Sequence, residues 1–276
     1  NAATSTAGFC AAAGIPCSIF VPQAAPRAKL AQLLAFGATV FPVEGTYDEA
    51  YGLAVQAADR FRWYNRSDGQ NPMVVEGNKT GALEVGEELH YALPDFALVA
   101  AGDGAVVAGI AKGFQELVKV GLAERAPRVY GVQAAGAAAI AHAFARYREG
   151  KPVLPAAEGA ETIADSIRVG NPQDALRAVL SVAETDGGFV TVTDEEIVAA
   201  GQELARRTGV FAEPSGAAPY AALLRLLREG TIPPGSRVVL FVTGSGLKDP
   251  EGALRGVEMP RAIPPTLAAV AEVVEG

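Results

Sequence analysis

Residues 95–113, DFALVAAGDGAVVAGIAKG, form the stretch that decides the fold. An uninterrupted apolar run, Phe96 to Ala101, predicts a strand buried on both faces of a parallel sheet. The turn Gly102-Asp103-Gly104 follows, and apolar residues at helical spacing begin directly after it. Glycines allow a tight turn with exposed N–H groups, and the positive end of the following helix dipole favours negative charge. The stretch therefore predicts an anion-binding turn, with phosphate as the expected ligand.

Three classes of phosphate-bearing ligand use a turn of this kind. A Walker loop needs Gly-Lys-Ser/Thr, which this stretch lacks. The dinucleotide fingerprint needs glycines at i, i+2 and i+5, whereas the third glycine here is Gly109, which comes too late. Pyridoxal phosphate is the remaining class. On these residues alone, two interpretations stay open: a pyridoxal phosphate site, and a plain strand–helix turn that binds no ligand.

The composition argues against several broad classes of protein. Half of the 276 residues are hydrophobic, which is enough for a sizeable core in one large or two modest domains. The net charge of −8 argues against a nucleic-acid partner, because phosphate backbones need a basic surface. No apolar run approaches the ~18 residues of a membrane span, so none is expected. Cys10 and Cys17 suggest neither a disulfide framework nor a metal site, so we expect a cytoplasmic protein without metal.

Strand and helix patterns alternate along the chain with short connections, which predicts an α/β fold of parallel strands covered by helices. The polar segment 65–72 interrupts the pattern and predicts a smaller domain at 1–66 and a larger one at 67–276. Segment 149–172 is expected to be an irregular surface excursion. The expected strands are 17–21, 39–43, 61–64, 96–101, 128–132, 189–193 and a buried strand at 237–242; the expected helices are 2–14, 29–36, 48–60, 76–91, one from about 105, 134–148, 173–184, 194–207 and 215–228.

Five further stretches resemble segments of one enzyme family when they are read in order. NAATSTAG at 1–8 resembles the part of the S-x-G-N-x-A-x-S motif of fold-type II pyridoxal phosphate enzymes that follows its Ser-Gly. The others are PRAKLAQLLAFGATV at 26–40, EGNKTGALEVGEEL at 76–89, TIADSIRVGNP at 162–172, and EPSGA at 213–217 with VTGSGLKD at 242–249. They are similar to segments of threonine synthases, and the similarity extends to about residue 255. The chain thus resembles the threonine synthase-like family, with two α/β domains and the cofactor between them.

The resemblance implies roles for ten residues around pyridoxal 5′-phosphate. The ring oxygen O3′ would accept a hydrogen bond from the Asn1 amide, and a hydroxyl, Thr243, would meet the pyridine nitrogen. A hydroxyl leaves that nitrogen unprotonated, which suits elimination and replacement at the side chain of an amino acid. The backbone N–H groups expected around the phosphate belong to Gly102, Asp103, Gly104, Ala105 and Val106, and the residues expected near the substrate are Thr4, Ser5 and Arg66.

The resemblance also concerns the lysine that holds the cofactor. In the family this Schiff-base lysine precedes the Ser-Gly-Asn motif, so it is expected upstream of Asn1, and no catalytic residue is expected in this chain. The lysines present match other family positions or lie in polar surroundings; they are Lys29, Lys79, Lys112, Lys119, Lys151 and Lys248.

One segment departs from the family pattern where substrate is recognised. Threonine synthases carry N-S-x-N-P-x-R-x-E-G there, whereas this chain has Asp68-Gly69 for Asn-Ser and Val74 for the arginine. The loop residue that is often Asn in the family is Asp103. Carboxylates repel a phosphate dianion, so phosphohomoserine is not expected to be the preferred substrate. Whether the charge of Arg66 compensates for the missing arginine and the added carboxylates stays open.

The sequence therefore predicts a pyridoxal phosphate-dependent lyase acting by elimination or replacement at the β or γ carbon of an amino acid. Two alternatives keep the cofactor: a 2-amino-4-oxopentanoate thiolase β subunit, which would need a small partner subunit, and a threonine or serine ammonia-lyase. A third alternative is a truncated, non-catalytic chain that binds a ligand or partner. A homodimer is expected for the enzyme.

Overall fold

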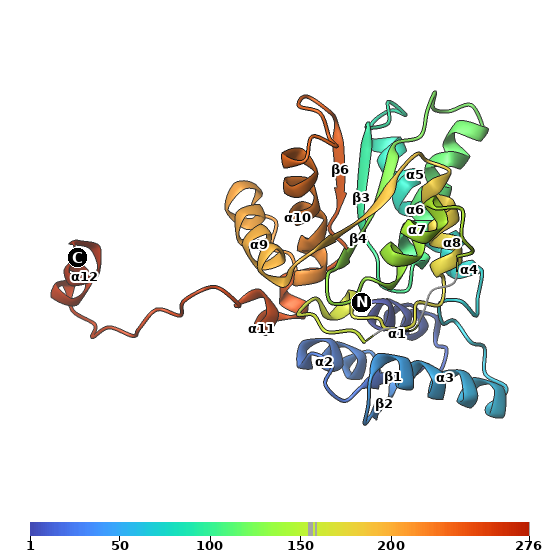
Figure 1. Cartoon of the computed structure of the whole chain (residues 1–276). Coiled ribbons are helices and arrows are strands. Elements are labelled where there is room, and N and C mark those ends of the chain that lie inside the picture. The colour runs from blue at the N-terminus through green and yellow to red at the C-terminus, as the bar shows by residue number, and fades with distance from the viewer. Residues whose placement is uncertain (154–156, 158, 276) are drawn as a thin grey trace.

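The computed structural model describes residues 1–153, 157 and 159–275, and its N-terminal part is a small parallel sheet with three helices (Figure 1). Strands β1 (Ser18–Pro22) and β2 (Thr39–Val43) pair in parallel. Helices α1 (Ala2–Ala13), α2 (Arg27–Ala35) and α3 (Tyr47–Phe61) surround them. The elements 17–21 and 39–43 expected from the sequence are thus confirmed as neighbouring strands.

The rest of the chain builds a four-stranded parallel sheet within the described residues, in the order β5-β4-β3-β6. The strands are β3 (Phe96–Ala100), β4 (Arg128–Ala134), β5 (Gly188–Val192) and β6 (Val238–Phe241). Every residue of β3 is buried, as its apolar run predicts. The α/β fold expected from the alternating pattern is confirmed.

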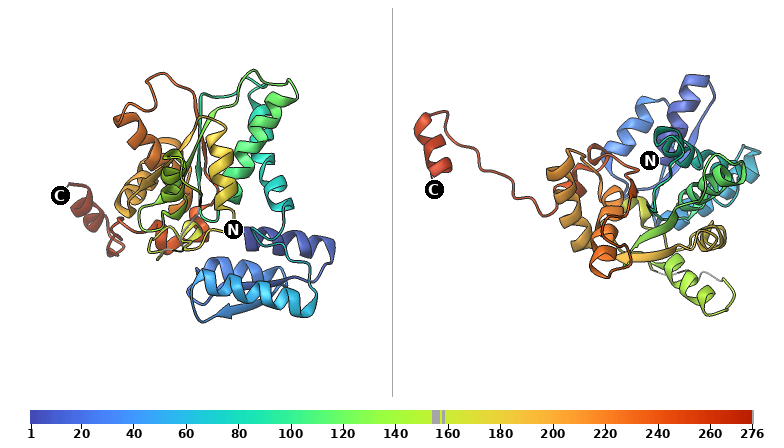
Figure 2. Two further views of the ribbon diagram at one scale, coloured as in Figure 1. Left: turned by 45° about the vertical axis from the view of Figure 1, so that its right-hand side comes forward. Right: turned by 90° about the horizontal axis from the view of Figure 1, so that it is seen from above.

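Helices cover both faces of the larger sheet, and the small sheet lies beyond one of its ends (Figures 1 and 2). One layer is formed by α4 (Met73–Asn78), α5 (Thr80–Glu88), α6 (Ala105–Lys119), α7 (Ala139–Arg148) and α8 (Ala175–Ala183), and the other by α9 (Asp194–Thr208) and α10 (Pro214–Arg228). Short helices η1 (Asp165–Ile167), η2 (Gly246–Lys248) and α11 (Pro250–Ala253) lie near the small sheet, whereas α12 (Leu267–Glu275) lies away from the body at the end of an extended linker.

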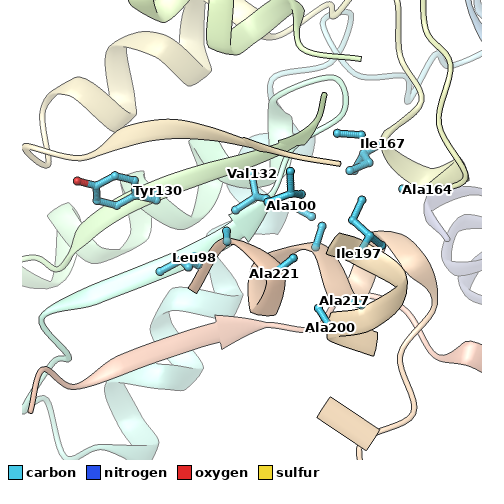
Figure 3. Close-up of a cluster of buried hydrophobic side chains, with 14 of the residues drawn as sticks. Leu98, Ala100, Tyr130, Val132, Ala164, Ile167, Ile197, Ala200, Ala217 and Ala221 are labelled. Carbon is cyan, nitrogen blue, oxygen red and sulfur yellow. The ribbon is translucent and has the colours of Figure 1, made fainter. Parts of the chain in front are cut away.

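The core of the larger unit follows the alternation of side chains along β3. Leu98 and Ala100 pack toward α9 and α10, where Ile197 and Ala217 lie (Figure 3). Alternate residues of the same strand, among them Val99, pack toward α6, α7 and α8. Because successive side chains point to opposite faces of a strand, one apolar run supplies both cores.

The strand order creates a crevice at the carboxyl ends of β3 and β6. The chain passes from β3 to β4 and β5 on one side, while β6 returns to the other side of β3. Val99 pairs with Phe241, so the turn after β3 and the residues after β6 leave the sheet next to each other. In open parallel sheets, ligands bind at such switch points, outside the carboxyl ends of the strands.

Local signals set several helix ends. Thr46 and Thr193 both cap their helices through a complete capping box, with Glu49 and Glu196 as the reciprocal partners. Gly14 ends α1 in the left-handed conformation with φ 66°. No helix among the described residues combines the length and apolar character needed to span a bilayer.

Four expectations were wrong. The strand at 61–64 does not form, because α3 continues to Phe61 and Arg62 closes it with φ 57°. The helix at 76–91 is two helices that meet at Lys79. The helix expected at 134–148 starts only at Ala139, because Ala134 still belongs to β4. The strand at 237–242 is the edge strand β6 and is half-buried, since one of its sides has no neighbouring strand in the described part of the chain.

Segment 149–172 also differs from the expected surface excursion. Its residues 154–156 and 158 lie outside the described residues, but the later part enters the core. Ala164 and Ile167 are buried against the sheet and α9 (Figure 3), and η1 lies at the edge of the crevice. The two sheets fall on either side of residue 66, while the domain boundaries themselves stay a prediction.

Candidate active site

A cavity of about 620 Å³ opens between the small sheet and the carboxyl ends of β3 and β6. All ten residues assigned to the site from the sequence line this cavity: Asn1, Thr4, Ser5, Arg66, Gly102, Asp103, Gly104, Ala105, Val106 and Thr243. They come from both sheets and from separate regions of the chain. Their shared position agrees with a single ligand site, while their individual roles stay predictions.

The turn after β3 has the backbone shape that an anion cradle requires. Gly104 has φ 103° and stands immediately before the 15-residue helix α6. A Cβ atom on Gly104 would lie 3.0 Å from the backbone oxygen of Asp174, and one on Gly102 would lie 3.1 Å from that of Ser166. The helix N-terminus directs unpaired N–H groups toward the cavity. Both the conformation and the crowding therefore call for glycine at position 104.

Asn1 is anchored in the floor of the cavity by a buried carboxylate. Its Nδ2 donates to Oε1 of Glu213 at 2.6 Å, and the Oγ of Ser166 donates to the same oxygen at 2.9 Å. The Asn1 Oδ1 is buried and has no hydrogen-bond partner. Glu213 is 1% exposed, and its charge is balanced by Lys29, whose Nζ lies 3.4 Å from Oε2.

Thr243 also lines the cavity, two residues after the end of β6. The next residue, Gly244, has no side chain where the Glu213 carboxylate passes; a Cβ there would lie 2.2 Å from Oε1. Glu213 therefore packs against the backbone of Gly244, the residue that follows Thr243.

Aromatic and acidic groups form the wall beneath the cradle. The Tyr47 hydroxyl donates to Oδ2 of Asp103 at 2.5 Å, and the backbone N–H of Gln173 donates to Oδ1 at 3.2 Å. Burial raises the pKa of Asp103 to about 6, partly offset by the Tyr47 hydrogen bond, and the Asp68 charge raises it further. Burial, followed by the Asp103 charge, raises the pKa of Tyr47 well above its ordinary value.

Arg66 and Asp68 stand together on the same wall, with Arg66 Nη1 3.7 Å from Asp68 Oδ1. Burial raises the pKa of Asp68, while the Arg66 charge lowers it. Val74, at the position where the family pattern has arginine, is not among the cavity-lining residues and packs beside Val75. The cation on this wall is therefore Arg66, and a carboxylate already engages it.

Thr4 and Ser5 lie at the N-terminal turn of α1 and line the cavity. Thr4 is 3% exposed, and its Oγ1 accepts a hydrogen bond from Lys248 Nζ at 3.0 Å. A helix N-terminus beside an ammonium group is a suitable place for a carboxylate.

Several cavity residues received no role from the sequence. The lining residues Lys29, Asp165 and Ser166, and their buried partner Glu213, lie within the motifs that resemble the family, so their position in the chain was visible, but their convergence was not. Tyr47 gave no signal at all, since it reads as an ordinary residue in the first turn of a helix.

These residues fit pyridoxal phosphate on three observations. The glycine turn before α6 would hold the phosphate, since a side chain at Gly104 would fill the space. The Asn1 amide lines a cavity large enough for the ring, and its Nδ2 is the kind of donor that the ring oxygen would need. The Thr243 hydroxyl offers a neutral partner for the ring nitrogen.

A parallel α/β scaffold with a glycine cradle at its switch point defines a class of cofactor-binding enzymes, and comparison with known proteins identifies the family. Residues 1–244 match the family described as pyridoxal-phosphate dependent enzyme. The chain belongs to this family, whose members use pyridoxal phosphate, so the cofactor expected from the sequence is confirmed.

Two threonine synthases and one solved structure illustrate the relationship. The chain is 38% identical to threonine synthase of Methanocaldococcus jannaschii over 94% of its length, and 37% identical to that of Mycobacterium bovis over 99%. It spans 64% of the first relative and 72% of the second. The structure of the processed form of threonine deaminase isoform 2 from Solanum lycopersicum matches with a TM-score of 0.71 and 20% identity, covering 100% of this chain and 70% of that one. The fold-type II architecture and the threonine synthase resemblance are thereby confirmed.

Proposed function

We propose that this protein acts on an amino acid by elimination or replacement at its β or γ carbon, with pyridoxal phosphate as cofactor. The observation that carries the proposal is the single cavity that joins the glycine cradle, the Asn1 amide and the Thr243 hydroxyl. The cofactor supplies an electron sink when it is bound, and a ring nitrogen that meets a hydroxyl keeps this sink moderate. The 37–38% identity to threonine synthases supports the same reaction class.

The chain's own residues would bind and orient the reactants. Backbone N–H groups of Gly102 to Val106 would hold the phosphate, and Asn1 would donate to the ring oxygen. Thr4 and Ser5 would receive the substrate carboxylate at the start of α1, beside the Lys248 ammonium. The wall of Tyr47, Arg66 and Asp68 would then face the substrate side chain.

The natural protein, purified at its full length, tests this proposal directly. It should take up pyridoxal phosphate and absorb in the visible region, and borohydride should make the attachment permanent. Peptide mapping then reports which lysine is labelled; we propose that it is none of the six in residues 1–276. A protein that stays colourless in excess cofactor would favour the non-catalytic alternative.

A second candidate function is the deamination of threonine or serine. It is favoured by Asp68 and Asp103, two carboxylates on the wall that faces the substrate side chain. Such a wall accepts a hydroxyl, which can donate a hydrogen bond to a carboxylate, more readily than a phosphate. Release of ammonia and a 2-oxo acid from threonine, without threonine formation from other substrates, would identify this reaction.

We further propose a cytoplasmic homodimer. The low cysteine content supports the location, and the resemblance to the family supports the dimer. Light scattering behind size exclusion tests the assembly and also shows whether a small subunit copurifies, as the thiolase alternative requires.

A further inference from the structure

Within the described part of the cavity, the buried charge of Glu213 is balanced by the ammonium group of Lys29. Its Oε1 accepts from Asn1 and Ser166, whereas Oε2 is buried and accepts no hydrogen bond. Among the described residues, the ammonium recorded in an ion pair with Glu213 is that of Lys29, 3.4 Å from Oε2. A buried carboxylate without a cation is strongly unfavourable, so the ion pair with Lys29 holds Glu213 in place.

Lys29 is itself held rigidly. It is 8% exposed, and its Nζ donates to Asp165 Oδ2 at 3.0 Å and to Ser166 Oγ at 2.9 Å. Ser166 then donates to Glu213 Oε1, so the ammonium reaches the carboxylate both directly and through this hydroxyl. The hydroxyl can serve both neighbours because it donates one proton and accepts at its lone pairs.

The hydrogen bond to Glu213 determines which way the Asn1 amide faces. A carboxylate only accepts hydrogen bonds, so the group beside Oε1 must be the NH₂ of the amide. The second hydrogen of that NH₂ lies toward Ser166 Oγ, with Nδ2 and Oγ 3.4 Å apart, and a ring oxygen could replace this long contact. If Glu213 were displaced, the NH₂ would lose this acceptor, the amide could rotate by half a turn, and the amide oxygen would face the ring oxygen.

We propose that Lys29 is a positioning residue that orients the Asn1 amide for the cofactor ring oxygen by acting through Glu213 and Ser166; this rests on the function proposed above. Lys29 belongs to α2 beside the small sheet, whereas Asp165, Ser166 and Glu213 belong to the larger unit. The contacts that orient the amide therefore join α2 of the small unit to the larger unit across the cavity.

A double-mutant cycle tests this inference through cofactor binding. Variants Lys29→Met, Lys29→Arg, Glu213→Gln and Lys29→Met/Glu213→Gln are titrated with pyridoxal phosphate, and binding is followed by fluorescence and by the absorption of the bound cofactor. Lys119→Met, at the exposed end of α6, is the matched control. Circular dichroism and urea denaturation establish that each variant is folded.

Lys29→Met is expected to weaken binding by about tenfold or more and to shift the absorption maximum, because the ring oxygen loses its donor. Lys29→Arg should retain most of the wild-type affinity and an absorption maximum close to that of the wild type. In the Glu213→Gln background, Lys29→Met should weaken cofactor binding little further, because the carboxylate charge that Lys29 balances is already absent. Wild-type affinity and spectrum in Lys29→Met, or additive effects of the two changes, would overturn the inference while leaving the proposed function intact. Failure of the wild-type protein to bind the cofactor would overturn both.

Discussion

At the scale of single residues, Gly104 is the position on which the cofactor cradle depends most. A side chain there would adopt an unfavourable φ of 103° and meet the backbone of Asp174 at 3.0 Å. Gly104→Val should therefore reduce the affinity for pyridoxal phosphate to an undetectable level, because a β-branched residue tolerates neither constraint. Equilibrium dialysis against the cofactor measures this loss.

Gly52→Val is the matched control for that change. Gly52 lies within α3, where an added Cβ would meet no heavy atom within 4 Å. It should bind the cofactor like the wild-type protein and should lose no stability, because valine is a better helix former than glycine. Unchanged cofactor affinity in Gly104→Val would show that the phosphate binds elsewhere.

Asp103 makes stability depend on pH. Its folded pKa of about 6 exceeds its ordinary value of 3.8, so the folded state binds the proton more tightly than the unfolded state. The stability of the apoprotein should thus be fully present below about pH 4 and should fall as pH rises through about 6. Asp103→Asn removes this titration and can still bond to Tyr47 and to the Gln173 N–H.

We expect Asp103→Asn to be more stable than the wild type by up to about 2–3 kcal/mol at pH 7.5, since one pKa unit corresponds to about 1.4 kcal/mol. The difference should shrink toward zero near pH 4. Urea denaturation at several pH values measures it. If the variant were less stable at neutral pH, or if the stability difference did not depend on pH, ionisation of Asp103 would not lower the stability of the folded protein.

At the scale of elements, the capping box of α9 holds a helix that packs against α10 and the main sheet. The Thr193 side chain accepts from the Glu196 N–H, and the Glu196 carboxylate accepts from the Thr193 N–H. Thr193→Ala should lower the free energy of unfolding by about 1 kcal/mol, because a helix donor loses its partner. Urea denaturation midpoints provide the measurement.

Thr6→Ala serves as the control for the cap. The Thr6 hydroxyl donates to the Ala2 carbonyl inside α1, so its removal leaves no donor without a partner. Its stability should stay within about 0.5 kcal/mol of the wild type. Equal losses in both variants would mean that the Thr193 cap contributes nothing specific.

At the scale of the whole molecule, the two units together decide which side chain a substrate can carry. The wall that they share presents Asp68 and Asp103 beside Tyr47, and its cation, Arg66, is paired with Asp68. A phosphate site normally offers unpaired Arg, Lys or N–H donors, each worth about 1.5–3 kcal/mol. Phosphohomoserine should consequently be a poor substrate, disfavoured on the order of a thousandfold relative to a site with a free arginine.

Steady-state kinetics with phosphohomoserine, threonine and serine as competing substrates decide this point. The expected result is a kcat/KM for phosphohomoserine below that of at least one unphosphorylated amino acid. Asp68→Asn should narrow the gap, because it frees Arg66 and removes a negative charge. Efficient phosphate release accompanied by threonine formation would instead identify a threonine synthase in which Arg66 takes the arginine's place.

The sequence by itself determined the features that depend on neighbouring residues. The apolar run of β3, the glycine turn, the start of α6 and the caps at Thr46 and Thr193 are local, because hydrophobic spacing, backbone freedom and side-chain capping act over a few residues. For this reason the cradle and most of the strands could be predicted. The prediction of a strand at 61–64 was wrong because the helical periodicity of α3 continues through Phe61.

Only the tertiary structure decided which charges meet inside the cavity. Asn1 lies 212 positions from Glu213 in the chain, and Lys29 lies 136 from Asp165. The sequence showed each of these residues within a motif but did not show how close together they lie in the folded chain. Buried polar groups must find partners across the fold, so their contacts depend on how the two sheets pack, and this packing is set by the whole chain.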